Sequence, residues 1–163
     1  MKPEFVTVGL AKRGASVRLK LRWDNSPETC QTLVEQMLPV RHQVWHAKYA
    51  NNEIYLLTEA PKVLPPMEWR TVYPAAGDLL YIPLPYGLPL PKVAPKADRE
   101  RGLVDLAYFY DRANSLLTGP FGPLPGTIVA TATSIEAVEQ MAVACNDVWF
   151  RGAEDETMYI EVG

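Results

Sequence analysis

The chain has 163 residues, of which 48% are hydrophobic and 21% are charged, and its formal net charge at pH 7 is -3. This length fits one domain over residues 1–163 with a sizeable core, and the composition excludes a disordered chain. A mildly acidic chain without a run of lysine or arginine lacks the electrostatic footprint of a protein that binds nucleic acid or anionic membranes. We therefore expect a globular protein with neither of these partners.

The N-terminal residues 1–14 contain no apolar stretch of signal-peptide length, and no segment of the sequence is long and apolar enough to cross a bilayer. We therefore expect a cytoplasmic protein. The two cysteines, Cys30 and Cys145, each fall on the apolar face of an expected helix. This placement favours two buried thiols in a reducing compartment over a disulfide or a metal site.

The first part of the chain predicts two strands and a helix. Residues 5–10 and 16–23 are strand-like, and the second of these segments alternates apolar and charged residues, as a strand with one solvated face does. Residues 24–39 predict a helix, because Pro27 suits a first helical position, apolar residues recur at helical spacing, and Pro39 ends the run.

The middle of the chain predicts a hairpin, a strand pair and a long loop. Residues 41–59 favour a β-hairpin that turns at Asn51-Asn52, because asparagine tolerates the positive φ angles of a tight turn. Residues 69–84 favour a second strand pair. Residues 83–103 hold five prolines, and a loop of this length is functional, disordered or an arm that contacts another copy of the chain.

The last part of the chain predicts three strands and a second helix. The strands are expected at 103–110, 127–133 and 157–162, and the first of them is the most apolar. The helix is expected between the last two strands, beginning with a capping box of Thr133 and Glu136. Many short strands and only two helices, without alternation between them, indicate a mainly β fold. A closed antiparallel β-barrel with one helix over each open end would cover the apolar face of both helices.

This order of elements resembles the cyclophilin-like fold. The best local match is FGPLPGTIVATATSIEAVEQM at 121–141, and SPETCQTLVEQMLP at 26–39 resembles the first helix of that fold. The stretches NNEIY and GDLLYIP are similar to those of a bacterial, uncharacterised branch of cyclophilin-like proteins, a family of domains of unknown function. The resemblance implies a closed barrel with two capping helices.

The activity known for the cyclophilin-like fold is prolyl isomerisation, which uses an arginine on the first strand of the hairpin. Here Lys48 is the cation nearest to that position, and it lacks the planar donor fork of arginine. Glu53 and Tyr55 lie where the resemblance implies an apolar platform, and burying an unpaired polar group costs roughly 2–7 kcal/mol. The sequence thus departs from the isomerase pattern, although a prolyl isomerase or a proline-peptide binder stays an alternative.

The resemblance places a site on the outer face of the barrel beside the hairpin. His46, Lys48, Glu53 and Tyr55 would adjoin there, and Arg112 follows the strand at 103–110. These side chains could bind a small polar or anionic ligand, with Arg112 holding two carboxylate oxygens at once, or supply acid/base chemistry near neutral pH. The alternative interpretation is a solvated edge hairpin in which Glu53 and Lys48 form an ordinary cross-strand pair.

A metal site is not expected. His42 and His46 are four residues apart, which on a strand separates them by about 13 Å. No cofactor is expected, and no residue is assigned a catalytic role. Three functions stand as hypotheses: a small-molecule-binding protein or enzyme built around Glu53, a prolyl isomerase, and a non-catalytic structural subunit that forms a homo-oligomer through residues 83–103.

Overall fold

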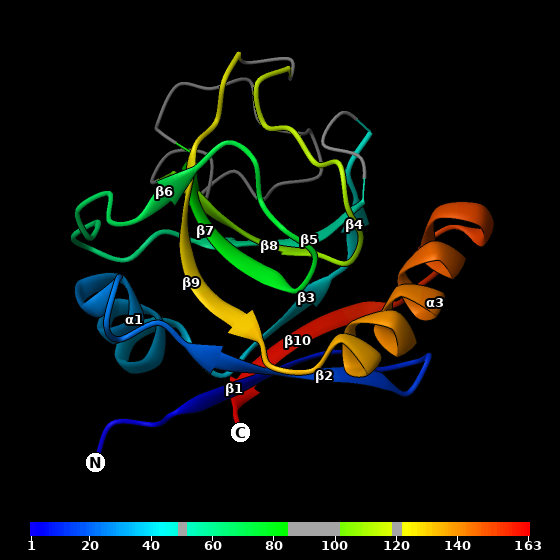
Figure 1. Ribbon diagram of the computed structural model, residues 1–163, viewed down its shortest axis with the longest axis horizontal. Helices are drawn as coiled ribbons and strands as arrows, with labels where there is room; N and C mark the ends of the chain where they lie inside the picture. Colours follow the sequence, from blue (N-terminus) through cyan, green and yellow to red (C-terminus); the bar gives the residue numbers. More distant parts are fainter. Residues whose placement is uncertain (49–51, 85–101, 119–121) are drawn as a thin grey trace.

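The structure is a computed structural model that describes residues 1–48, 52–84, 102–118 and 122–163, and in this part of the chain ten antiparallel strands form one sheet (Figure 1). In chain order the elements are β1 (Phe5–Leu10), β2 (Ala15–Leu21), α1 (Pro27–Thr32) with a π-helical continuation η1 (Leu33–Met37), β3 (Val40–Gln43), β4 (Trp45–His46), β5 (Glu53–Glu59), β6 (Arg70–Thr71), β7 (Asp78–Leu84), β8 (Leu103–Phe109), β9 (Gly126–Ala132), α3 (Ile135–Arg151) and β10 (Thr157–Val162). The mainly β prediction is thereby confirmed.

The sheet is an open path and not a barrel. Its strand order is β3-β10-β1-β2-β9-β7-β8-β5-β4, with β6 paired to β9 beside this path. Among the described residues, no ladder of hydrogen bonds joins the end strands β3 and β4, which are separated in the chain by Val44 alone. At Val44 the chain leaves its ladder with β10 and enters a ladder with β5. The closed barrel expected from the cyclophilin-like resemblance is therefore wrong.

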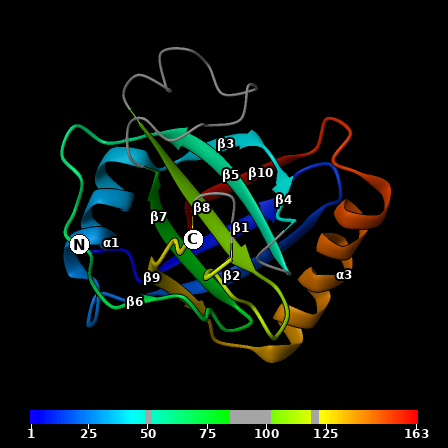
Figure 2. The same ribbon diagram turned by 90° about the horizontal axis from the view of Figure 1, so that it is seen from above.

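Both predicted helices are present, and they lie at opposite ends of the curled sheet (Figure 2). The N-cap of α3 is Ser134 and not the predicted Thr133, because Ser134 still has an extended backbone and its Oγ accepts a hydrogen bond from Ala137 N at 3.2 Å. The same hydroxyl donates to Glu136 Oε2 at 2.7 Å. No helix within the described ranges has the length and apolar character needed to span a membrane.

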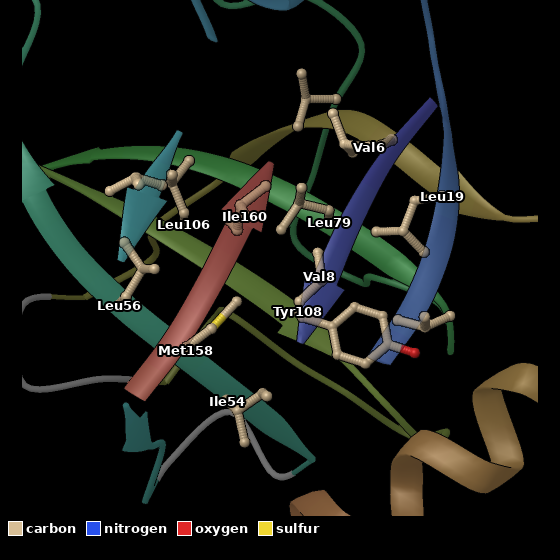
Figure 3. Packing of buried hydrophobic residues seen from close by; sticks show 14 of the residues in the cluster. Val6, Val8, Leu19, Ile54, Leu56, Leu79, Leu106, Tyr108, Met158 and Ile160 are labelled. Carbon is tan, nitrogen blue, oxygen red and sulfur yellow. The ribbon is translucent and has the colours of Figure 1, made fainter. Parts of the chain in front are cut away.

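The main core fills the inner face of the sheet. Figure 3 shows apolar side chains of β1, β2, β5, β7, β8 and β10 meeting there, among them Val8, Leu19, Leu56, Leu106 and Ile160. The helices add their apolar faces, which include the buried free thiols Cys30 and Cys145. The predicted burial of both cysteines is confirmed.

A second, smaller apolar cluster lies on the opposite face of β5, β7 and β8. Leu80, Ile82, Leu103, Ala107 and Phe109 are its most buried members. Successive side chains of a strand point to opposite faces, so these strands carry apolar residues on both faces. This explains why residues 103–110 form the most apolar strand of the sequence.

Two expectations concern residues that the structure does not describe. Most of the proline-rich segment 83–103, expected as a candidate oligomer arm, lies outside the described residues, which resume at Gly102. Asn51 of the expected Asn51-Asn52 turn also lies outside them.

A buried carboxylate ties the loop between α3 and β10 to the turn between β1 and β2. Glu156 is fully buried, and its carboxylate accepts hydrogen bonds from the backbone N–H groups of Lys12, Arg13 and Thr157 at 2.7–2.9 Å. The guanidinium of Arg13 adds a contact of 3.2 Å to the same carboxylate. Charge-assisted bonds of this kind are stronger than neutral ones.

We predict that Glu156→Ala lowers the free energy of unfolding by about 3 kcal/mol, because three backbone N–H groups and one cation lose their acceptor together. Urea unfolding followed by circular dichroism measures this loss. The matched control is Glu154→Ala, since Glu154 is exposed and its side chain makes no hydrogen bond to the residues that the structure describes. Equal stability of the two variants would contradict the role given to Glu156.

Candidate functional site

The register of the β4–β5 hairpin decides which of the predicted site residues can meet. His46 pairs with Ile54, and Ala47 N donates a hydrogen bond to Glu53 O at 3.0 Å. Paired residues share a face of the sheet, and the next residue along a strand takes the other face. His46 therefore lies on one face, whereas Glu53 and Tyr55 lie on the other.

A pocket of about 460 Å³ lies where this hairpin meets α3 and the turn after β8, and we call it the hairpin pocket. Three of the predicted site residues line it: His46, Lys48 and Arg112. The wall is completed mainly by Asn52, Tyr110, Asn146, Trp149 and Phe150. Lys48 and Arg112 are exposed, and no carboxylate is among the described lining residues. Both charged residues of the described lining are therefore cations, within a chain of negative net charge.

Buried amide contacts position Arg112 at the rim of the hairpin pocket. Asn114 is buried, and its Oδ1 accepts from Asn52 N at 3.2 Å while its Nδ2 donates to Asp111 O at 2.7 Å. Asn52 Nδ2 in turn donates to Arg112 O at 2.8 Å. Ala113 takes a positive φ of 61° between them. These contacts join the turn after β8 to the hairpin, so that Lys48 and Arg112 face the same hollow from two chain segments.

The floor of the hairpin pocket is a hydrogen-bonded His–Tyr pair. The Nε2 atom of His46 lies 2.6 Å from Tyr110 Oη, and its Nδ1 atom lies 2.9 Å from Ala47 O. A carbonyl oxygen only accepts hydrogen bonds, so Nδ1 carries a proton. Burial lowers the pKa of His46 and favours the neutral ring. The Trp149 ring packs on His46 at a centroid distance of 4.8 Å.

Two carboxyl groups lie on the other face of the sheet, Glu53 on β5 and Asp105 on the neighbouring strand β8. Glu53 is only 4% exposed, and Asp105 pairs with Leu57 on the same face, two residues beyond Tyr55. Asp105 Oδ1 is buried without a hydrogen-bond partner among the described residues. Burial raises the pKa of Glu53 to about 8, and burial followed by the Glu53 charge raises the pKa of Asp105 well above its ordinary value.

Tyr55 belongs to the same group. Burial raises its pKa first, and the charges of Asp105 and Glu53 raise it further. The three polar groups therefore interact electrostatically beside the second apolar cluster, where Glu53 holds its proton near neutral pH. Among the described residues no ion pair joins Glu53 to Lys48, the pair that the alternative interpretation of the hairpin expected.

The sequence analysis missed several residues of both groups. Tyr110, Asn146 and Trp149 of the hairpin pocket were not predicted, because only the packing of α3 against the hairpin brings them near His46. Asp105 carried a visible signal, since it is a lone charged residue inside the apolar strand LVDLAYF. A charge at such a position is uncommon unless it is paired or functional. His42, which the sequence analysis considered with His46 for a metal, is exposed on β3.

We predict that Glu53→Gln weakens the pH dependence of stability. Folded Glu53 keeps its proton up to a pKa of about 8, whereas the ordinary pKa of the group is 4.5. Unfolding between these values releases a proton, so the free energy of unfolding falls as the pH rises through this window, by up to about 1.4 kcal/mol per pH unit. Urea unfolding at pH 5, 6.5 and 8 measures the slope, with exposed Glu161→Gln as the control. An unchanged slope in Glu53→Gln would contradict the buried, protonated state.

Comparisons with known proteins give one structure of similar fold and one matching family. The structure is similar to that of McbB in complex with tryptophan, with a TM-score of 0.65 and 15% sequence identity, over 96% of this chain and 44% of that chain. At this identity the likeness shows the fold alone. This chain thus spans less than half the length of that structure, and no curated protein matches its sequence. A family model matches residues 8–160, nearly the whole sequence, and the chain therefore belongs to the family described as "Protein of unknown function (DUF3830)".

Proposed function

We propose that the protein binds a small organic anion in the hairpin pocket, with a carboxylate as the group held by Lys48 and Arg112. The observation that carries this proposal is that both cations line the hairpin pocket, whose described lining residues include no carboxylate. In a chain of net charge -3, such a local excess of positive charge favours anionic ligands. Arg112 offers paired N–H donors that match two carboxylate oxygens, and Lys48 supplies a point charge.

The size and the wall of the hairpin pocket indicate what the rest of the ligand is. A volume of about 460 Å³ lies within the range of small-molecule sites. Trp149 and Phe150 are 50% and 79% exposed and adjoin each other at its rim, and an exposed apolar patch beside polar groups is typical of a ligand-binding groove. Burying them against a ligand removes apolar surface from water. The ligand therefore combines a carboxylate with an apolar, flat body.

The structural neighbour supports a ligand of this kind. McbB was determined in complex with tryptophan, an aromatic molecule with a carboxylate. Residue roles are not transferred from McbB, because its sequence identity to this chain is low, and the proposal rests on the side chains of the hairpin pocket.

The buried free thiols Cys30 and Cys145 support a reducing compartment. We therefore place the protein in the cytoplasm as part of this proposal.

We predict that Lys48→Met and Arg112→Gln each weaken the binding of 3-phenylpropanoate about three- to tenfold, because each removes one partly solvated charge from the carboxylate. Isothermal titration calorimetry at two ionic strengths measures the affinity, which falls as salt screens the cations. Arg70→Gln is the control, since it removes an exposed cation outside the hairpin pocket.

The uncharged amide 3-phenylpropanamide completes this experiment and is expected to bind far more weakly than the acid. The proposed function would be contradicted if 3-phenylpropanoate and its amide bound equally well, or if Lys48→Met and Arg112→Gln both kept the wild-type affinity for the acid. Binding of a proline peptide that is indifferent to Lys48 and Arg112 would instead favour the isomerase hypothesis.

A further inference from the structure

We propose that the ligand of the hairpin pocket carries a hydrogen-bond donor beside its carboxylate, so that it is a hydroxy acid or an amino acid and not a simple acid. The residue that selects this donor is Tyr110, positioned by His46. The inference rests on the proposed function, since it concerns the same pocket, and it adds a requirement that the two cations alone do not impose.

The protons of the His46–Tyr110 pair are arranged by the backbone. His46 Nδ1 lies 2.9 Å from Ala47 O and must donate to it. In the neutral ring, Nε2 is then the acceptor, and the hydroxyl of Tyr110 at 2.6 Å donates to it. Transfer of this proton from Tyr110 to His46 would leave a phenolate, which also has no proton to donate. In both arrangements, the Tyr110 oxygen can accept a hydrogen bond from a ligand in the pocket but cannot donate one.

Tyr110 is therefore an acceptor in a pocket whose charged groups, among the described lining residues, are the donors Lys48 and Arg112. Tyr110 and His46 both line the hairpin pocket, and no other hydrogen bond involves Tyr110 Oη among the described residues. Lys48 and Arg112 can only donate hydrogen bonds, and in the proposed complex they bind the carboxylate of the ligand. The wall also holds the amides of Asn52 and Asn146, and Asn52 Nδ2 donates one hydrogen bond to Arg112 O at 2.8 Å. An amide group offers both donors and an acceptor, so neither amide requires a donor on the ligand as Tyr110 does.

A ligand that covers Tyr110 without donating to it leaves an acceptor unpaired, which costs affinity. Sites built around a hydrogen bond discriminate strongly against analogues that lack the matching group. A hydroxyl or an amine next to the carboxylate satisfies the Tyr110 oxygen while the cations hold the acid, and the apolar body contacts Trp149.

The test compares three carboxylates with one carbon skeleton: 3-phenyllactate, its O-methyl derivative 2-methoxy-3-phenylpropanoate, and 3-phenylpropanoate. The first carries a donor, the second only an acceptor, and the third neither. We expect calorimetry on the wild type to show 3-phenyllactate binding about tenfold more tightly than the other two. In Tyr110→Phe this ratio is expected to fall to about one, whereas the control Tyr73→Phe, which removes an exposed hydroxyl outside the pocket, keeps it.

A second variant tests the proton arrangement without removing the tyrosine. In His46→Leu the Tyr110 hydroxyl is released to donate into the pocket, so the O-methyl derivative is expected to gain affinity relative to 3-phenyllactate. Circular dichroism confirms that each variant is folded.

The outcomes separate this inference from the proposed function. Equal wild-type affinities for the three acids, with binding still dependent on Lys48 and Arg112, would overturn the donor requirement and leave the proposed function standing. A tenfold preference that persists in both Tyr110→Phe and His46→Leu would also overturn it. Failure of all three acids to bind would contradict the proposed function and this inference together.

Discussion

The alternation of side chains across the β4–β5 hairpin is the constraint on which the chemistry of this molecule depends. The strand register, which includes the backbone hydrogen bond from Ala47 N to Glu53 O, places the side chains of His46 and Glu53 on opposite faces of the sheet. A slip of one residue would exchange the faces and bring a buried carboxyl toward Lys48 and Arg112. The contacts of Asn52 with the turn after β8 hold the hairpin in this register.

The two faces keep opposite charges apart. On the pocket side Lys48 and Arg112 are exposed to solvent, and the aromatic end of α3 gives the hairpin pocket an apolar wall. On the other side burial raises the pKa of both Glu53 and Asp105, which favours their neutral forms. Glu53 keeps its proton near neutral pH and therefore places no negative charge beside the cations of the hairpin pocket.

The sequence predicted the elements better than their arrangement. Periods of two and 3.6 residues are local, so the strands, both helices and the burial of Cys30 and Cys145 could be predicted. The open path could not, because it depends on pairings remote in sequence, such as β2 with β9, and on the change of ladder at Val44. The grouping of His46, Lys48 and Arg112 was expected, and their role in binding stays a prediction. The separation of Glu53 and Tyr55 from them follows from a register that composition does not specify.

The measurement that tests the central claim most directly is a nuclear magnetic resonance titration that follows the indole N–H signals of the four tryptophans with 3-phenyllactate. Trp149 lines the hairpin pocket, whereas Trp45 pairs with Tyr55 and lies on the carboxyl face of the same hairpin. Trp149→Phe and Trp45→Phe assign the two signals. We predict that the Trp149 signal moves with ligand while the Trp45 signal stays in place. Movement of the Trp45 signal with an unchanged Trp149 signal would place the ligand beside Glu53 and contradict the account.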